Sequence, residues 1–230
     1  MLTQFIEDGI IYEKNMFNEL VVLGLVKGYS PKEITIPPNV HNQVVSEIAG
    51  DAFRHAQVEV VNIPFTIRVI RSGAFSFCTN LKSVTIPFAW FESEKDTLCI
   101  EPYSFIDCWN LKSFTGNRAI SVQTRAFQNC YELSSLEGLR IQRLEKESFF
   151  DCASLHEAVF CSSVIMPSQC LNGWALNKAT FLGDAVMHID VVQVCKNRNI
   201  KIVCDEKSNL PNLAYEGLLI ECYGIKDNYD

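Results

Sequence analysis

The chain has 230 residues, of which 48% are apolar and 20% are charged, and its formal net charge is −7. This apolar content is enough to fill a packed core, so the composition excludes a disordered chain. The acidic balance disfavours nucleic acid and anionic membranes as partners, because both are bound through basic surfaces. The longest apolar run, at 20–26, is too short to cross a bilayer.

A small residue followed by an aromatic residue recurs along the chain at almost constant spacing. The copies are Ala52-Phe53, Ala74-Phe75, Ser104-Phe105, Ala126-Phe127 and Ser148-Phe149, with Cys170-Leu171 as a degenerate sixth copy. The second members are 22, 30, 22, 22 and 22 residues apart. A fixed period in this range is typical of one supersecondary unit stacked on copies of itself, so the sequence predicts a solenoid.

In chain order, the first predicted element is a hairpin that pairs 8–12 with 20–26 and covers the N-terminal end of the solenoid. Each unit then has a main strand that alternates apolar and polar residues, a second short strand, and an Ala-Phe-x-x-Cys segment that we expect to form one helical turn. Main strands are predicted at 34–37, 58–64, 81–86, 111–116, 133–138, 155–160, 176–181 and 200–203. Second strands are predicted at 45–48, 67–70, 98–100, 120–122, 141–144 and 164–166.

The 30-residue gap marks an insertion of eight residues near 88–96, which contains Phe88, Trp90 and Phe91 followed by three acidic residues. Insertions of this kind often lie on the binding face of a solenoid, and aromatic clusters form interface anchors. The alternative is a hairpin whose aromatic side chains fold back on the neighbouring coil, and we favour it because large aromatics are seldom left exposed.

Beyond the repeats, apolar residues at helical spacing in 184–195 predict a helix packed on the last coil, and 213–223 predicts a final strand or hairpin. The expected fold is a β-dominated α/β solenoid with a parallel sheet, short helical turns, an N-terminal hairpin cap and a C-terminal helical cap. We divide this single continuous domain into the cap at 1–30, the solenoid at 31–182, and the degenerate last repeat with the C-terminal cap at 183–230.

Residues 34–203 resemble the BspA-like leucine-rich repeat, because the pattern Leu-x-x-Val-x-Ile-Pro, then Ile, then Ala-Phe-x-x-Cys recurs in phase through several copies. The start of the chain is also similar to the N-terminal cap of that family. The resemblance implies a right-handed leucine-rich-repeat solenoid that recognises proteins or cell surfaces without catalysis. Many members are secreted or surface-displayed, whereas residues 1–10 here lack the pattern of a signal peptide.

Four cysteines share one repeat phase, three residues after the aromatic: Cys78, Cys108, Cys130 and Cys152. They could form a metal or disulfide ladder, but we favour a column of small buried thiols, because neighbouring parallel side chains are poorly aimed for disulfide geometry. The nearest approach to a metal cluster is Cys152, His156 and Cys161, which is short of the four converging ligands of a zinc site. Persistent free cysteines are typical of a reducing compartment.

The polar positions of the main strands point away from the core and form the most promising site. They begin at Thr35 and Asn62 and end at Thr180 and Lys201. The predicted partner-binding residues of this row are Asn62, Ser83, Thr85, Ser113, Thr115, Ser135, Glu137, Glu157 and Lys178, to which the insertion adds Phe88, Trp90 and Phe91. Solenoids bind extended partners on such a face. The alternative is a strand surface chosen for solubility, since Ser and Thr also suit solvated strands.

Our first hypothesis is a non-catalytic module that binds a protein or glycan-bearing surface, with no cofactor, no metal, no nucleic acid and no membrane insertion. The alternative is a structural spacer, or the repeat portion of a larger surface adhesin, with no ligand of its own. A third is an enzyme with a pocket that groups Cys170, His188 and an acid. The expected location is cytoplasmic for the chain as given, or secreted or cell-surface if a leader was removed.

Overall fold

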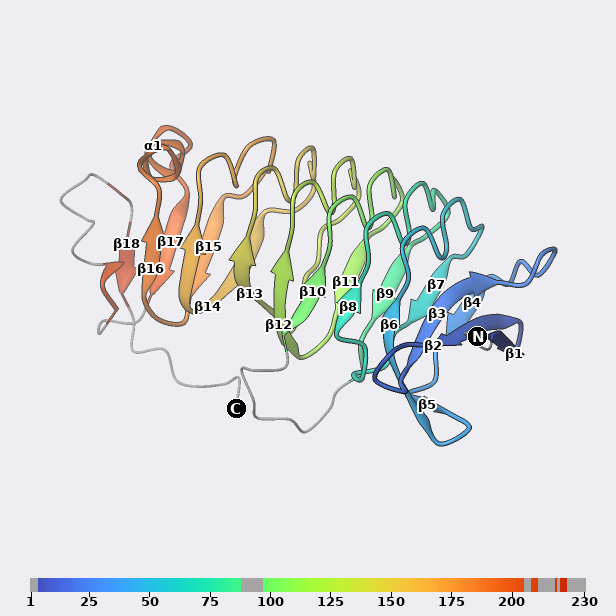
Figure 1. Ribbon diagram of the computed structural model, residues 1–230. Helices are drawn as coiled ribbons and strands as arrows, with labels where there is room; N and C mark the ends of the chain where they lie inside the picture. The colour runs from blue at the N-terminus through green and yellow to red at the C-terminus, as the bar shows by residue number, and fades with distance from the viewer. Residues whose placement is uncertain (1–3, 88–96, 205–207, 211–217, 219, 223–230) are drawn as a thin grey trace.

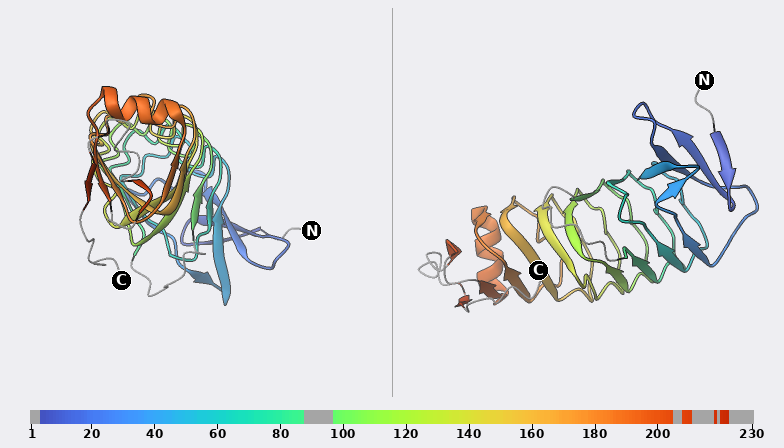
Figure 2. Two further views of the ribbon diagram at one scale, coloured as in Figure 1. Left: turned by 90° about the vertical axis from the view of Figure 1, so that its left-hand side faces the viewer. Right: turned by 90° about the horizontal axis from the view of Figure 1, so that it is seen from below.

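The computed structural model describes residues 4–87, 97–204, 208–210, 218 and 220–222. The chain winds into an elongated stack of coils, with the N-terminal strands at one end and the helix α1 near the other (Figure 1). Seen along its length, the stack is a closed loop of chain that surrounds a packed interior (Figure 2). The solenoid and its mostly parallel sheets were predicted from the repeat and are confirmed.

An antiparallel cap covers the N-terminal end. Strands β1 (Gln4–Glu7), β2 (Ile10–Lys14) and β3 (Leu20–Leu25) form a meander, of which β2 and β3 are the predicted hairpin. Strand β3 then pairs in parallel with β6 (Gln43–Ile48), and the short β5 (Asn39–Val40) pairs with β6 in the antiparallel direction. The alternating buried residues of β3 reach the core, so the cap and the solenoid share one interior.

The first coils carry two strands each, in two separate sheets. The predicted main strands form a four-stranded sheet, called here the main-strand sheet, and the predicted second strands belong to a longer sheet that continues from the cap. The main-strand sheet contains β4 (Glu33–Thr35), β7 (Val60–Asn62), β9 (Ser83–Thr85) and β11 (Ser113–Thr115). The longer sheet continues through β8 (Val69–Ile70), β10 (Leu98–Ile100), β12 (Arg118–Val122) and β13 (Leu139–Leu144).

The two strand positions merge farther along the chain. Strand β14 (Glu157–Met166) covers both positions in one continuous run and pairs with β15 (Lys178–Phe181) and with β16 (Ala185–Met187). Strand β15 is followed across the sheet by β17 (Lys201–Cys204) and β18 (Ile220–Cys222). The strand predicted at 133–138 is wrong: it is reduced to one bridge between Ser113 and Ser135, because the chain turns at Gly138, where φ is +75°.

The Ala-Phe-x-x-Cys segments are not helical turns, which corrects that detail of the prediction. In the coil of Phe105, for example, Tyr103 and Asp107 have φ values of 60° and 59°, in the left-handed region that interrupts a right-handed helix. The amides of Phe105 and Asp107 donate to carbonyls of the next coil, at 2.8 and 2.9 Å. The segment is therefore a series of tight turns that hydrogen-bond from coil to coil, and we call this side of the solenoid the turn edge.

The aromatic residues of the repeat stack in one column through the core. Phe53, Phe75, Phe105, Phe127 and Phe149 are fully or almost fully buried, and neighbouring ring centroids are 4.9–5.1 Å apart with interplanar angles of 3–11°. The predicted in-register stacking is thus confirmed. The column ends on Trp174, whose ring lies 4.5 Å from that of Phe149, rather than on the Leu171 of the degenerate copy.

The C-terminal helix is shorter than predicted and begins later. Helix α1 (Ile189–Asn197) takes the place of the turn edge after β16, so 184–188 forms strand and N-cap instead of helix. His188 accepts a hydrogen bond from the amide of Asp190 at the N-cap. The helix buries Val191, Val192 and Cys195, as its apolar spacing predicts.

Candidate recognition surface

The outward side chains of the main-strand sheet, which are polar apart from Val60, form a surface called here the strand face. In the sheet register, Ser83 lies opposite Ser113, and Thr85 lies opposite Thr115. On the neighbouring strand β7, Asn62 lies opposite Thr85. The predicted register of these residues is therefore confirmed. Ser135 extends the row by its bridge to Ser113, and Glu137 follows it in an exposed position.

The central hydroxyl groups of the strand face are unsatisfied by the protein. Within the part of the chain that the structure describes, Ser83, Thr85, Ser113 and Thr115 make no side-chain hydrogen bond, and all four are partly exposed. Val84 and Phe114 between them are fully buried, so the strands hold these hydroxyls on a rigid support. A hydroxyl both donates and accepts, so the four groups can bind amide or hydroxyl groups of a partner.

At the N-terminal border of the strand face, the polar side chains bond to one another. The Asn62 amide donates to Glu33 and to Thr35, both at 3.0 Å. Glu59 binds Lys32 at 3.2 Å and Lys82 at 2.5 Å. These side chains already bond to one another. The Asn62 amide is therefore less available to a partner than we expected from its position in the sequence.

Glu157 and Lys178 lie on the longer sheet, in β14 and β15, and not on the main-strand sheet. They are opposite each other in the register, and their side chains form an ion pair of 2.8 Å. Lys201, opposite Lys178, binds Glu221 at 2.7 Å. The predicted row thus falls into two parts, a hydroxyl-rich part with free groups and a charged part with paired groups. Phe88, Trp90 and Phe91 lie outside the described residues.

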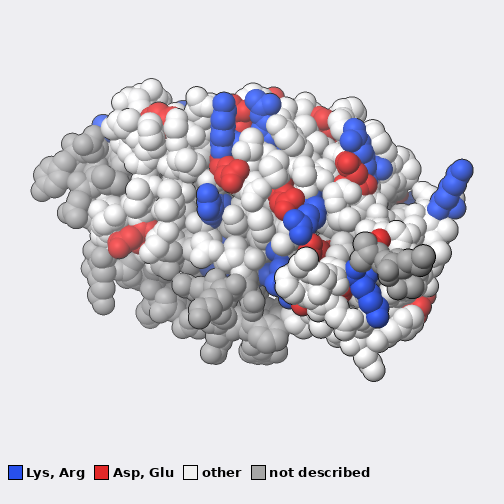
Figure 3. All heavy atoms as spheres, viewed as in Figure 1, with Lys and Arg blue, Asp and Glu red and all other residues white. Residues whose placement is uncertain are grey.

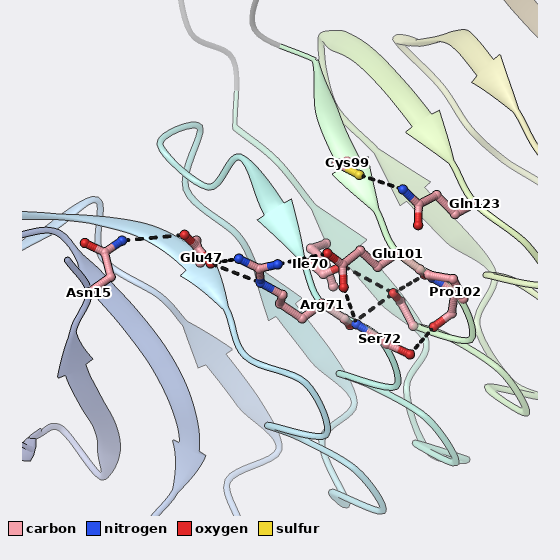
Figure 4. A network of polar contacts seen from close by, with 10 residues as sticks. Asn15, Glu47, Ile70, Arg71, Ser72, Cys99, Glu101, Pro102 and Gln123 are labelled. Carbon is pink, nitrogen blue, oxygen red and sulfur yellow. Dashed lines mark hydrogen bonds and ion pairs between the residues drawn. The ribbon is translucent and has the colours of Figure 1, made fainter. Parts of the chain in front are cut away.

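The outer surface of the longer sheet carries its own polar contacts next to the cap (Figure 4). The Arg71 guanidinium binds Glu47 at 2.6 Å and Glu101 at 3.1 Å, and the second oxygen of Glu101 accepts the amide of Ser72. Hydrogen bonds to Glu47, the largest cause, raise the pKa of Arg71. Asn15 of the cap also reaches Glu47 at 3.5 Å, so this network joins the cap to the first coils. Such internal pairing leaves less bonding capacity for a partner than the strand face has.

Acidic and basic side chains are interspersed over the surface in Figure 3. Among the described residues in this view, neither sign forms a large area of its own. On this face, the described charges of the two signs are therefore mixed.

The repeated cysteines are buried free thiols, as we favoured from their spacing. Each thiol donates to the carbonyl of the stacked Phe in the preceding coil, at 2.9–3.2 Å: Cys78 to Phe53, Cys108 to Phe75, Cys130 to Phe105 and Cys152 to Phe127. Burial raises the pKa of Cys78 to about 12 and also raises the pKa of the other three thiols. The column is therefore structural, and its thiols stay protonated and unreactive.

We expect alkylation by iodoacetamide at mildly alkaline pH to distinguish this column from Cys99, which is partly exposed on the longer sheet. Burial raises the pKa of Cys99 as well, but its thiol is partly accessible to the reagent whereas the column thiols are fully buried. Cys99 should therefore be modified before the four column thiols, which should react after denaturation only. Peptide mass spectrometry before and after addition of urea measures this order. Modification of Cys108 or Cys130 in the native chain at the rate of Cys99 would contradict the assignment.

The other predicted groups do not form a site. No cluster of three His, Cys, Asp or Glu residues suited to a metal occurs among the described residues, so Cys152, His156 and Cys161 do not converge on one. His156 contacts the carbonyl of Ala175 at 3.2 Å. Cys170 is buried with its pKa raised to about 12 by that burial, while the His188 ring contacts Asp190 at 2.6 Å.

Sequence reasoning missed two features of the solenoid. Trp174 closes the aromatic column and donates its indole N–H to the carbonyl of Leu155 at 3.1 Å. Trp174 does not occupy the repeat position of the stacked Phe residues, so the motif did not reveal its role at the end of the column. The large size of its side chain was the one signal in the sequence. Trp109 and Tyr131 were also missed; they share a repeat phase, four residues after the stacked Phe, and lie exposed on the turn edge.

Comparisons with known proteins agree with this architecture. The family model for the BspA-type leucine-rich repeat region matches in six copies, over residues 28–94, 46–165 and 88–196. A search of curated proteins gives no match. In the described residues, no helix is long and apolar enough to span a membrane.

Two crystal structures share this fold. A leucine-rich cell surface protein from Faecalibacterium prausnitzii is 21% identical with a TM-score of 0.55, and the match covers 79% of this chain and 55% of that one. A leucine-rich repeat protein from Eubacterium ventriosum is 18% identical with a TM-score of 0.56, covering 76% and 44%. This chain thus spans about half the length of these structures. With its matched repeats and its solenoid of in-register coils, the chain belongs to the BspA-type leucine-rich repeat family.

Proposed function

We propose that this chain is a non-catalytic interaction module that binds an extended protein segment on its strand face. The observation that carries the proposal is the set of four free hydroxyls, on Ser83, Thr85, Ser113 and Thr115, held in register on adjacent strands. An extended partner presents backbone amides and carbonyls at regular intervals, and rigid hydroxyls can bind them without a large entropic cost. Ser135 and Glu137 continue the surface, while the paired Glu157 and Lys178 border it.

A role at the cell surface is part of this proposal. It is supported by the fold that the chain shares with the leucine-rich cell surface protein from Faecalibacterium prausnitzii. The insertion with Phe88, Trp90 and Phe91 would add anchoring contacts if these aromatics face the partner.

A spacer without a ligand is the second candidate. The observation in its favour is that the chain spans only about half of the larger leucine-rich repeat structures it matches, at 55% and 44% of their lengths. The free hydroxyls held in register on adjacent strands are the observation that supports the binding module.

Selection of peptides from a phage-displayed library on the immobilised chain tests the proposal. We expect the enriched peptides to lose about tenfold or more in affinity when Ser113 and Thr115 are both replaced by arginine, because two long side chains would cover the strand face. The matched control is Ser121→Arg, which places the same side chain on the longer sheet and should leave the affinity unchanged.

Two outcomes would contradict the proposal. If no peptide is enriched over a bare support, the spacer is the better interpretation. If the peptides bind the strand-face variant as well as the parent chain, the binding site lies elsewhere. Circular dichroism of each variant shows whether the fold is kept.

A further inference from the structure

Two large aromatic side chains lie exposed on the turn edge, which precedes the main strand in each coil. Trp109 and Tyr131 are 47% and 44% exposed, and they occupy the same repeat position in neighbouring coils. Neighbouring coils are about 4.8 Å apart, as hydrogen-bonded strands are. The two rings therefore lie on adjacent coils at the same edge and can contact one partner group.

A carboxylate beside these rings is fixed in position. Asp107 Oδ1 accepts the indole N–H of Trp109 at 3.2 Å and the side-chain amide of Asn129 at 2.7 Å. These bonds hold the indole and join the two coils. In the described part of the chain Asp107 Oδ2 makes no bond, so it remains available to a donor from outside.

The two turn segments that carry the rings contain two carboxylates that form no ion pair with a described residue. The turn segments 103–110 and 125–132 contain the carboxylates Asp107 and Glu132 and one cation, Arg125. Arg125 is bound by Glu147 at 2.6 Å, whereas neither Asp107 nor Glu132 forms an ion pair with a described residue. Aromatic faces and carboxylates both attract cations, so the exposed rings and the carboxylates both favour a cationic partner group.

The same edge shows this contact within the chain. The Phe77 ring lies one coil toward the N-terminus from Trp109. The Arg54 guanidinium of the coil before it lies over this ring, 5.3 Å from its centroid, and His55 stacks on the ring at 5.0 Å. There an arginine of the protein itself covers the aromatic. The rings of Trp109 and Tyr131, in contrast, are exposed, and the Asp107 carboxylate lies beside Trp109.

We propose that Trp109, Tyr131 and Asp107 form a second docking site, which binds an arginine side chain of a protein partner. The guanidinium would lie against the exposed rings and donate to Asp107 Oδ2. Arginine fits better than lysine, because its planar group can stack on a ring and donate to a carboxylate at the same time. None of its residues belongs to the strand face, so the site does not depend on the proposed function of that face.

Isothermal titration calorimetry with an acetylated tetra-arginine peptide tests the site. The comparison peptide is tetra-citrulline, in which a neutral urea group replaces each guanidinium. We expect the arginine peptide to bind about tenfold or more tightly than the citrulline peptide, and the Trp109→Ala/Tyr131→Ala variant to lose about tenfold in affinity. Asp107→Asn should weaken binding as well, and raising the salt concentration should weaken it further.

Tyr103→Ala is the matched control, because Tyr103 is 40% exposed on the coil of Trp109. It should leave the affinity unchanged. The Trp109 indole resonance, assigned by its loss in Trp109→Phe, should shift with the arginine peptide. Equal binding of both peptides, an equal loss in the Tyr103 variant, or an unmoved indole resonance would overturn the proposal.

Discussion

Replacing Phe105 with alanine is expected to destabilise the chain by about 3–5 kcal/mol, the usual cost of removing a buried Phe ring. Phe105 is fully buried, and it stacks at 5.0 Å on Phe75 and on Phe127 and meets Phe114 edge-on at 5.4 Å. Its loss would open a cavity in the middle of the column and break contacts with two neighbouring coils. Equilibrium unfolding in urea, followed by circular dichroism, measures the change.

The control for this variant is Tyr103→Ala, on the same coil. Tyr103 is 40% exposed, so its removal should lower the free energy of unfolding by about 1–2 kcal/mol, which is less than the loss at Phe105. A similar small effect at Phe105 would mean that the rings are not packed as described. Solenoids can unfold in segments, so coincidence of the transitions seen by different probes should be checked for both variants.

Gly138→Ala is the second substitution for which we expect a large effect. Gly138 has φ +75°, and a Cβ atom there would lie 1.9 Å from the carbonyl oxygen of Gly116 in the preceding coil. The clash is with backbone, so the coils must separate to relieve it. We expect a loss of about 3 kcal/mol or more, from left-handed strain and overpacking together.

Gly28→Ala separates these two causes. Gly28 has φ +86°, but a Cβ atom there meets no atom within 4 Å. The strain alone should then cost about 1–2 kcal/mol. Equal losses for the two variants, measured in the same urea titration, would show that the close approach of Gly116 and Gly138 is not a constraint.

Much of the fold was predictable because the repeat fixes which side chains share a column. The register of Ser83 with Ser113 and of Phe105 with Phe127 follows from the repeat motif, since each of these coils places the same motif position next to its counterpart in the neighbouring coil. The cap hairpin was predictable from its two apolar runs. These predictions rest on periodicity, which tertiary packing reinforces rather than overrides.

Other features have no such signal. Tyr103 and Arg125 adopt left-handed conformations although neither residue type favours them, because coil-to-coil hydrogen bonds impose that geometry. The segment predicted as the strand 133–138 loses its ladder near Gly138. Trp174 closes the aromatic column from outside the repeat phase, which no alignment on the motif could place.

The candidate site was predictable in position but not in bonding. The alternation of the main strands placed Ser83, Thr85, Ser113 and Thr115 on one surface. Whether a polar side chain is free to bind a partner depends on residues that are distant in the sequence but adjacent in the stack. The contact of Asn62 with Glu33 is an example. The acidic and aromatic group around Trp109 likewise forms because Asp107 and Asn129 come from different coils.

A double-mutant cycle between Phe105 and Phe127 tests the stacked coils most directly. Stacked rings in contact should show a coupling free energy of about 0.5–1.5 kcal/mol. The reference cycle, between Phe53 and Phe149 at the two ends of the Phe column, should show a coupling near zero. Urea unfolding of the four single and two double alanine variants provides both values. A coupling near zero for Phe105 and Phe127 would contradict the alignment of coils on which the strand face and the turn-edge site both depend.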